Sequence, residues 1–152
     1  MSTVHARLDD TFDPAVELAA LTHSAAGDGA VVSFVGLARP VTKTGDPVKT
    51  VFLEHHPRLT TKSLDEIASD AARRFLVSHV RVVHRFGEIA AGEPIVFAGT
   101  AAPHRRAAFE ATDYLMDRLK TEAVFWKREE GPSGSRWIEP TEADYADRGR
   151  WE

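Results

Sequence analysis

The sequence predicts an α+β fold, because its apolar residues change between helical spacing and strand-like runs without the strict alternation of a parallel βαβ sheet. We expect a mostly antiparallel sheet with three main helices. The chain has 152 residues, a length that suits one domain, 1–152, with a substantial hydrophobic core. No repeat or low-complexity tract divides it, so a second domain is not predicted.

The first expected helix begins at Asp13-Pro14, where an aspartate can cap the helix and a proline can occupy its first position. It ends before the glycines at 27–29. Apolar runs then predict two paired strands, 30–36 and 48–55, joined by a loop. The remaining elements also follow one of the two periods and are expected in this order: an amphipathic helix over 60–76, strands over 80–89 and 94–101, a helix from Pro103 to about Lys120, and a hairpin of 124–129 with 135–139.

Composition excludes several classes of function. The chain has no cysteine, which excludes disulfides, thiolate metal sites and any mechanism through a protein thiol or persulfide. Its formal net charge of −4 argues against binding to nucleic acid or to a membrane surface, because such proteins rely on a net basic field. The N-terminus shows no charged-then-apolar leader and no apolar run approaches a membrane span, so a cytoplasmic protein is expected.

Metal and cofactor motifs are also missing from the sequence. The histidines and acidic residues do not combine into a three-ligand metal site; His55 and His56 fall on opposite faces of a strand, and His84 lies within another. Neither of the two Gly-rich phosphate-binding patterns occurs, and no serine lies in a nucleophile elbow. We therefore expect no metal and no bound cofactor.

Two lysines supply the main candidate site. Lys120 lies at the end of the late helix and Lys127 on the strand that follows, with an apolar aromatic stretch between them. Such lysines can converge on one anion in a partly dry pocket, where the pKa of an ammonium group shifts readily. For either lysine alone, the more frequent arrangement is a stem on the core and an ammonium group in water. The interpretation of the two lysines as an anion site therefore depends on evidence from other residues.

Basic residues also open the late helix, at His104, Arg105 and Arg106. The N-terminus of a helix already favours an anion, and basic side chains there are unfavourable unless an anion or an acid compensates them. These residues predict, with equal weight, either a phosphate or carboxylate site or a structural salt bridge to Glu110 or Asp113.

A loop arginine, Arg39, could complete an anion site, although most such arginines are simply solvated. No side chain other than lysine offers a plausible nucleophile, and Lys120 is the first candidate. The residues alone therefore predict a cationic, aromatic-lined site that binds an anion and has a lysine at its centre.

Seven segments of the sequence together resemble the MoaE family, the large catalytic subunits of molybdopterin synthase. Their order and spacing match over residues 29–139, and as a set they are highly specific. The sequence departs from the family at Pro40 and His56, and its tail, 141–152, matches poorly. The segments are 34–39 (FVGLAR), 53–57 (LEHHP), 83–88 (VHRFGE), 92–93 (GE), 103–105 (PHR), 109–111 (FEA) and 119–129 (LKTEAVFWKRE).

The resemblance implies a fold of the α/β-hammerhead type and a sulfurtransferase. Enzymes of this family install two sulfurs on cyclic pyranopterin monophosphate as a dithiolene, and the C-terminal thiocarboxylate of a small ubiquitin-like subunit of the MoaD type supplies the sulfur. A homodimer of large subunits carries one small subunit at each end, which makes a heterotetramer. The family's catalytic lysines correspond to Lys120, the central one, and Lys127. The positions that match its substrate contacts are Leu37, Ala38, Arg39, His104, Arg105, Lys120, Lys127, Arg128 and Glu129.

Two other functions are compatible with the residues. A non-catalytic module could bind a phosphorylated ligand or an acidic C-terminal tail through the same cations. Such a module would survive the loss of Lys120 at reduced affinity, whereas a catalyst would lose its rate. A purely structural dimerisation protein is disfavoured, because it does not need cations beside aromatic residues. The sequence does not indicate which carbon Lys120 first approaches.

Overall fold

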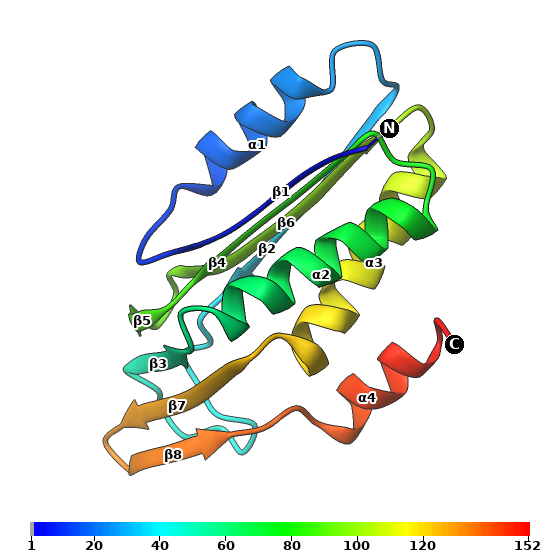
Figure 1. Ribbon diagram of the computed structural model, residues 1–152. Helices are drawn as coiled ribbons and strands as arrows, with labels where there is room; N and C mark the ends of the chain where they lie inside the picture. The colour runs from blue at the N-terminus through cyan, green and yellow to red at the C-terminus, as the bar shows by residue number, and fades with distance from the viewer. Residues whose placement is uncertain (1) are drawn as a thin grey trace.

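Two four-stranded β-sheets form the framework of the structure, a computed structural model that describes residues 2–152 (Figure 1). The first sheet has the strand order β1-β4-β6-β2 and the second β5-β3-β7-β8. The strands are β1 (Thr3–Asp9), β2 (Ala30–Leu37), β3 (Thr50–His55), β4 (His79–Arg85), β5 (Gly87–Ala90), β6 (Pro94–Ala102), β7 (Phe125–Gly131) and β8 (Gly134–Ile138). The helices are α1 (Pro14–Ser24), α2 (Leu59–Arg74), α3 (Arg105–Glu122) and α4 (Glu142–Gly149).

Helices cover both faces of the first sheet. α2 and α3 pack on one face and α1 packs on the other (Figure 1). Side chains alternate between these faces along β4: Val80 and Val82 lie in the core under α2 and α3, whereas Val83 lies with Leu21 in a smaller core under α1. β1 pairs with β4 in parallel, and the other strand pairs described over residues 2–152 are antiparallel.

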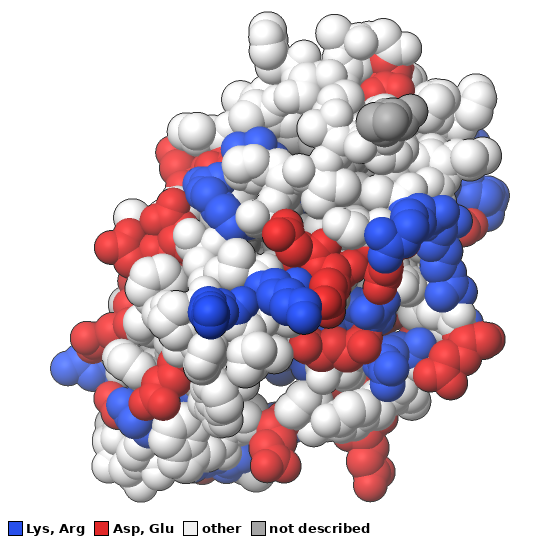
Figure 2. All heavy atoms as spheres, in the orientation of Figure 1, with Lys and Arg blue, Asp and Glu red and all other residues white. Residues whose placement is uncertain are grey.

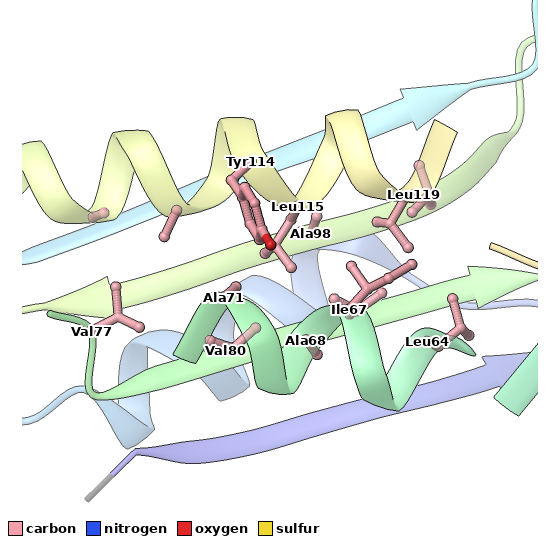
Figure 3. Packing of buried hydrophobic residues seen from close by; sticks show 14 of the residues in the cluster. Leu64, Ile67, Ala68, Ala71, Val77, Val80, Ala98, Tyr114, Leu115 and Leu119 are labelled. Carbon is pink, nitrogen blue, oxygen red and sulfur yellow. The ribbon is translucent and has the colours of Figure 1, made fainter. Parts of the chain in front are cut away.

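The main hydrophobic core lies between the first sheet and the helices α2 and α3 (Figure 3). α2 turns one face toward it, because Leu64, Ile67, Ala68 and Ala71 recur at helical spacing. Each of these four side chains is at most 1% exposed. Burial of a leucine or isoleucine side chain contributes about 1.5–3 kcal/mol relative to leaving it in water. This packing fixes α3 along its length and therefore fixes the position of its C-terminal end.

The second sheet packs against one end of the main core. Its own small core contains Val51, Leu53 and Ile89, which are at most 4% exposed. Ile95 of β6 and Phe125 of β7 pack against both cores. The second sheet and the C-terminal end of α3 therefore hold a fixed relation to one another.

The α+β class, the mostly antiparallel pairing and the three main helices are confirmed. Two strand predictions are wrong. The run 80–89 forms β4 and β5, which belong to different sheets. Gly87 begins β5 with a φ of 84°, a left-handed value that glycine adopts at little cost. The strands expected to pair over 30–36 and 48–55 are β2 and β3, and they also lie in different sheets: β2 pairs with β6, whereas β3 pairs with β5 and β7. β1 and α4 lie outside the predicted elements, whereas the other elements occur within a few residues of their expected bounds.

The C-terminal segment folds back beside α3. α4 begins with a capping box at Thr141. Beyond the helix, Trp151 packs edge-on against Phe75 and Tyr114, and its indole N–H donates to Asp117 at 2.7 Å. These contacts hold α4 against the second half of α3 and give the tail 141–152 a defined position.

An ion cluster ties α1 to the first sheet. Glu17 of α1 is 3% exposed and accepts hydrogen bonds from Arg7 of β1, at 2.8 and 2.9 Å, and from Arg81 of β4, at 3.0 Å. The hydrogen bond from Arg7 is the main cause that lowers the pKa of Glu17, and Arg81 adds to it. A carboxylate can be buried here because two guanidinium groups satisfy its oxygens.

We predict that Glu17→Ala lowers the free energy of unfolding by about 3 kcal/mol, because it leaves two partly buried arginines without their carboxylate. Since folding lowers the pKa of Glu17, this contribution is fully present above the ordinary value of 4.5 and is lost as the pH falls through the lower folded value. Urea unfolding from about pH 3 to about pH 7 measures both effects. Glu66→Ala is the control, because Glu66 is exposed and only pairs with Lys62 at 3.8 Å. Equal losses in the two variants would contradict the prediction.

Candidate functional site

Four cations gather where the end of α3 meets β7. The pKa of Lys127 is lowered first by burial and then by the charge of Lys120, and Arg39 and Lys43 add further repulsion. We call these four residues the cationic cluster. Among residues 2–152, none of the four forms a salt bridge with a carboxylate. The structure thus brings the two predicted lysines together, with Lys120 exposed and Lys127 partly buried.

Hydroxyl groups of α2 fix the turn between the two lysines. The chain becomes extended at the C-cap of α3, directly before this turn. The hydroxyl of Thr60 donates to the carbonyl of Val124, and the backbone N–H of Val124 donates to the hydroxyl of Ser63 at 3.1 Å. Thr60 is fully buried. The first turns of α2 therefore set the direction in which the chain passes from one lysine to the other.

An aromatic pair borders the cationic cluster. The ring of Phe125 stacks on the ring of His84, with centroids 4.2 Å apart and 28° between the planes. Burial first, and then the charges of Lys127 and Lys120, lower the pKa of His84 to about 4, although a hydrogen bond to the backbone of Arg85 opposes the shift. The imidazole is therefore neutral at neutral pH. The sequence alone assigned no function to His84. The one feature that could have pointed to it is that this polar residue ends a buried apolar run.

The end of β2 delivers Arg39 to the cationic cluster. Ala38 is 2% exposed, and hydrogen bonds fix its backbone on both sides: its N–H donates to the carbonyl of Glu93 at 2.8 Å, and its carbonyl accepts from Gly92 at 2.7 Å. Leu37, by contrast, is 57% exposed. A fixed backbone followed by a guanidinium group suits the binding of an anion.

α4 approaches the same cluster through Asp144. Burial raises the pKa of Asp144, but the backbone N–H of Thr141 and the charges of Lys120 and Lys43 lower it, and the net shift is downward. The sequence left the role of the tail 141–152 open. Its fold places one carboxylate at the margin of the cationic cluster.

His104 and Arg105 lie at the other end of α3. His104 is the N-cap residue and makes no capping hydrogen bond through its side chain. Arg105 precedes Lys120 by four turns of the helix, about 22 Å at 1.5 Å per residue. Within residues 2–152 neither basic residue forms a salt bridge with Glu110 or Asp113, and Asp113 pairs with a different arginine. One chain therefore presents two separate groups of predicted site residues.

Arg128 and Glu129 point to opposite faces of β7, because side chains alternate along a strand. The guanidinium of Arg128 lies over the rings of Phe52, at 4.9 Å, and Trp137, at 5.4 Å, and pairs with Glu130 at 2.9 Å. Glu129 shares the face of Lys127, and its charge raises the pKa of that lysine against the other causes. Glu129 therefore lies on the face of β7 that carries Lys127, and Arg128 lies on the opposite face.

Charge on the face in view is mixed. Figure 2 shows lysine and arginine side chains interspersed with aspartate and glutamate. With a formal net charge of −4, an anion site on this protein is local. No group of three or more His, Cys, Asp and Glu side chains within residues 2–152 could hold a metal ion. In that same range no helix combines the length and the apolar character needed to cross a membrane.

Comparison with known proteins gives concordant matches. The model of the MoaE protein family matches residues 8–122. The molybdopterin synthase catalytic subunit of Caulobacter vibrioides is 49% identical over 144 residues, which cover 95% of this chain and 94% of that protein. A solved structure of the molybdopterin biosynthesis MoaE protein from Burkholderia ambifaria is 40% identical, has a TM-score of 0.79, and is matched over 99% of this chain and 98% of its own.

A more distant solved structure shares the fold. It is the complex of subunits 1 and 2 of the molybdopterin-converting factor from Helicobacter pylori, with 18% identity and a TM-score of 0.68, and the match covers 92% of this chain and 90% of that chain. At this identity the likeness concerns the fold alone. The family match over most of the chain and the close relative together show that this chain belongs to the MoaE family.

Proposed function

We propose that the chain is the catalytic subunit of a molybdopterin synthase and transfers sulfur to cyclic pyranopterin monophosphate, forming the dithiolene of molybdopterin. The observation that carries the proposal is the cationic cluster, in which Lys120 and Lys127 lie close together and neither has a salt-bridge partner among residues 2–152. A relative with about half of its residues identical carries that name, which supports an enzyme role in molybdenum cofactor biosynthesis.

The chemistry of the cationic cluster suits a phosphorylated substrate. The guanidinium of Arg39 can bind two phosphate oxygens, and Lys127 interacts strongly with charge because little water surrounds it. The same groups can neutralise an oxyanion that develops when a carbonyl carbon is attacked. Lys120, at the exposed margin, is free to approach either the thiocarboxylate carbon or the side-chain carbon of the pterin.

Sulfur must reach this site on a second molecule, because the chain has no cysteine to hold it. We propose a small ubiquitin-like partner whose C-terminal thiocarboxylate enters the site and leaves at least twice for each dithiolene. The Helicobacter pylori protein of the same fold forms a complex of two subunits, which supports an enzyme of this composition. A tail that ends in glycine can pass through a narrow groove as an extended strand.

A second copy of the chain is proposed to cover the free edge of the first sheet. β2 is an edge strand, and its side chains Phe34, Val35 and Leu37 are 42%, 36% and 57% exposed. Phe109, on the neighbouring helix α3, is 60% exposed. Proteins normally pair or cover an apolar edge of this kind. A symmetric homodimer covers it on both copies at once.

Such a homodimer also explains why the predicted site residues lie at two ends of one helix. Arg105, Phe109, Met116 and Lys120 share one side of α3, because they recur at intervals of four, seven and four residues. When two copies pair about a two-fold axis with their α3 helices antiparallel, Arg105 and His104 of one copy face Lys120 of the other. Each complete site is then built from both chains.

We also propose that residues 1–152 act as one domain. Phe125 and Ile95 pack against the cores of both sheets, which supports this organisation. The alternative function, a non-catalytic module for a phosphorylated ligand, uses the same cations but needs no reaction at Lys120. Turnover by a variant at that position therefore separates the two.

Lys120→Ala should abolish dithiolene formation and leave the protein folded, because the side chain is exposed. The single-turnover rate with thiocarboxylated partner and cyclic pyranopterin monophosphate should fall on the order of a hundredfold or more. Lys62→Ala, which removes an exposed lysine of α2, is the control and should keep the wild-type rate. If the folded Lys120→Ala protein kept wild-type turnover, Lys120 would not be catalytic and the catalytic assignment would be wrong.

Mixing two inactive variants tests the shared site. Each homodimer of Lys120→Ala or of Arg105→Ala has two defective sites, but a mixed dimer has one intact site, with Arg105 from one copy and Lys120 from the other. Random exchange in an equal mixture should restore about a quarter of the wild-type activity. Mixing Lys120→Ala with a Lys120→Met variant is the control and should restore none. The account of the homodimer is wrong if the first mixture also stays inactive while mixed dimers form.

The partner's tail supplies a further prediction. Replacing the terminal glycine pair of the partner with two bulky residues should stop sulfur transfer, because we propose that the tail enters a groove too narrow for side chains. The globular body of the partner is kept, and both complex formation and dithiolene formation are measured. Undiminished transfer would show that the tail does not enter a narrow groove.

A further inference from the structure

His84 is held in one orientation by its surroundings. It lies at the end of β4, on the face of the first sheet that α2 and α3 cover, and it is 9% exposed. The ring of Phe125 stacks on it with centroids 4.2 Å apart. The stacking fixes the plane of the imidazole, and the hydrogen bond of Nδ1 to the backbone fixes which way round the ring lies.

The backbone sets the tautomer of this histidine. Nδ1 lies 2.9 Å from the carbonyl oxygen of Arg85. A carbonyl oxygen only accepts hydrogen bonds, so Nδ1 carries the proton and Nε2 is left with a lone pair. The lowered pKa, about 4, keeps the ring neutral at neutral pH. Nε2 of His84 is therefore a hydrogen-bond acceptor at neutral pH.

This acceptor has no partner within the described chain. No hydrogen bond among residues 2–152 ends on Nε2 of His84; the one that its ring makes uses Nδ1. In the same range no buried side-chain nitrogen or oxygen is left without a hydrogen-bond partner. Nε2 must therefore reach solvent. It is the ring atom that can accept a hydrogen bond from a group outside the core.

Two ammonium groups act on the imidazole of His84 through their charge. Phe125 touches the imidazole, and Lys127 is the next side chain on the same face of β7. Lys127 and Lys120 are the charged groups whose fields lower the pKa of His84, and Lys127 contributes more. The ammonium group of Lys127 is therefore the candidate donor to the free acceptor, although residues 2–152 do not form this hydrogen bond in the structure.

We propose that His84 is a positioning residue: when an anion binds at the cationic cluster, Nε2 of His84 accepts a hydrogen bond from the ammonium group of Lys127 and so directs this lysine toward the anion. The inference rests on the function proposed above for the cationic cluster. A carboxylate in this place would hold Lys127 equally well but would cancel its charge. A neutral imidazole orients the ammonium group and leaves the positive charge available to a phosphate or an oxyanion.

The first test needs no substrate. Nitrogen NMR of the histidine rings in the intact chain should show a proton on Nδ1 of His84 and none on Nε2. Lys127→Met removes the nearer charge, so the pKa of His84 should rise, whereas the control Lys62→Met should leave it unchanged. A proton on Nε2, or a pKa that does not respond to Lys127→Met, would overturn the inference.

The second test compares two amides at position 84 in the dithiolene assay. His84→Asn keeps a group that can donate to the carbonyl of Arg85, whereas His84→Gln places its amide oxygen near the former Nε2. We expect kcat to fall about tenfold in the Asn variant and to stay within about threefold of wild type in the Gln variant, with KM for the partner unchanged.

The outcomes separate this inference from the proposed function. Equal kcat values in folded Asn and Gln variants would leave His84 a structural role only and overturn the inference. If either variant fails to fold, the NMR test with Lys127→Met decides. If the wild-type chain makes no dithiolene, the proposed function fails, and the NMR test still decides whether the tautomer of His84 is the one inferred and whether the charge of Lys127 acts on its ring.

Discussion

The site depends on one constraint: two ammonium groups are held close together, and neither forms a salt bridge with a carboxylate among residues 2–152. Lys120 and Lys127 repel each other, and an unfolded chain would let them separate. The fold prevents this, because the hydroxyls of Thr60 and Ser63 fix the turn between α3 and β7. Phe125 anchors the start of β7 in both cores. An anion bound between the lysines would relieve the repulsion, so we expect the packing of the fold to give this site affinity for anions.

Much of this framework follows from local pattern in the sequence. The Asp13-Pro14 start of α1 is confirmed, and the side chain of Asp13 accepts from the N–H of Ala15 at 2.9 Å. The apolar spacing over 60–76 correctly predicts α2, since an amphipathic helix needs only its own residues and a core to face. The placement of Lys120 at a helix end and Lys127 on the next strand also follows from the change of period between them.

The remaining features depend on contacts between residues far apart in the sequence. The run 80–89 has strand character throughout. It is divided at Gly87 because its first part pairs in one sheet and its second part in the other. His84 gains a role only through its stacking on Phe125 and the lysines beside it. The placement of Arg128 and Lys127 on opposite faces of β7 could have been predicted from the sequence, because side chains alternate along a strand. The family resemblance nevertheless groups the two residues together.

The central claim is that sulfur is transferred at the cationic cluster of this chain. The most direct measurement mixes the purified protein with a thiocarboxylated ubiquitin-like carrier and cyclic pyranopterin monophosphate and assays the dithiolene product. Product should form only when all three are present, and none should form when the carrier ends in an ordinary carboxylate. Product without a thiocarboxylated carrier, or no product from folded protein that binds both the carrier and the pterin, would contradict the account.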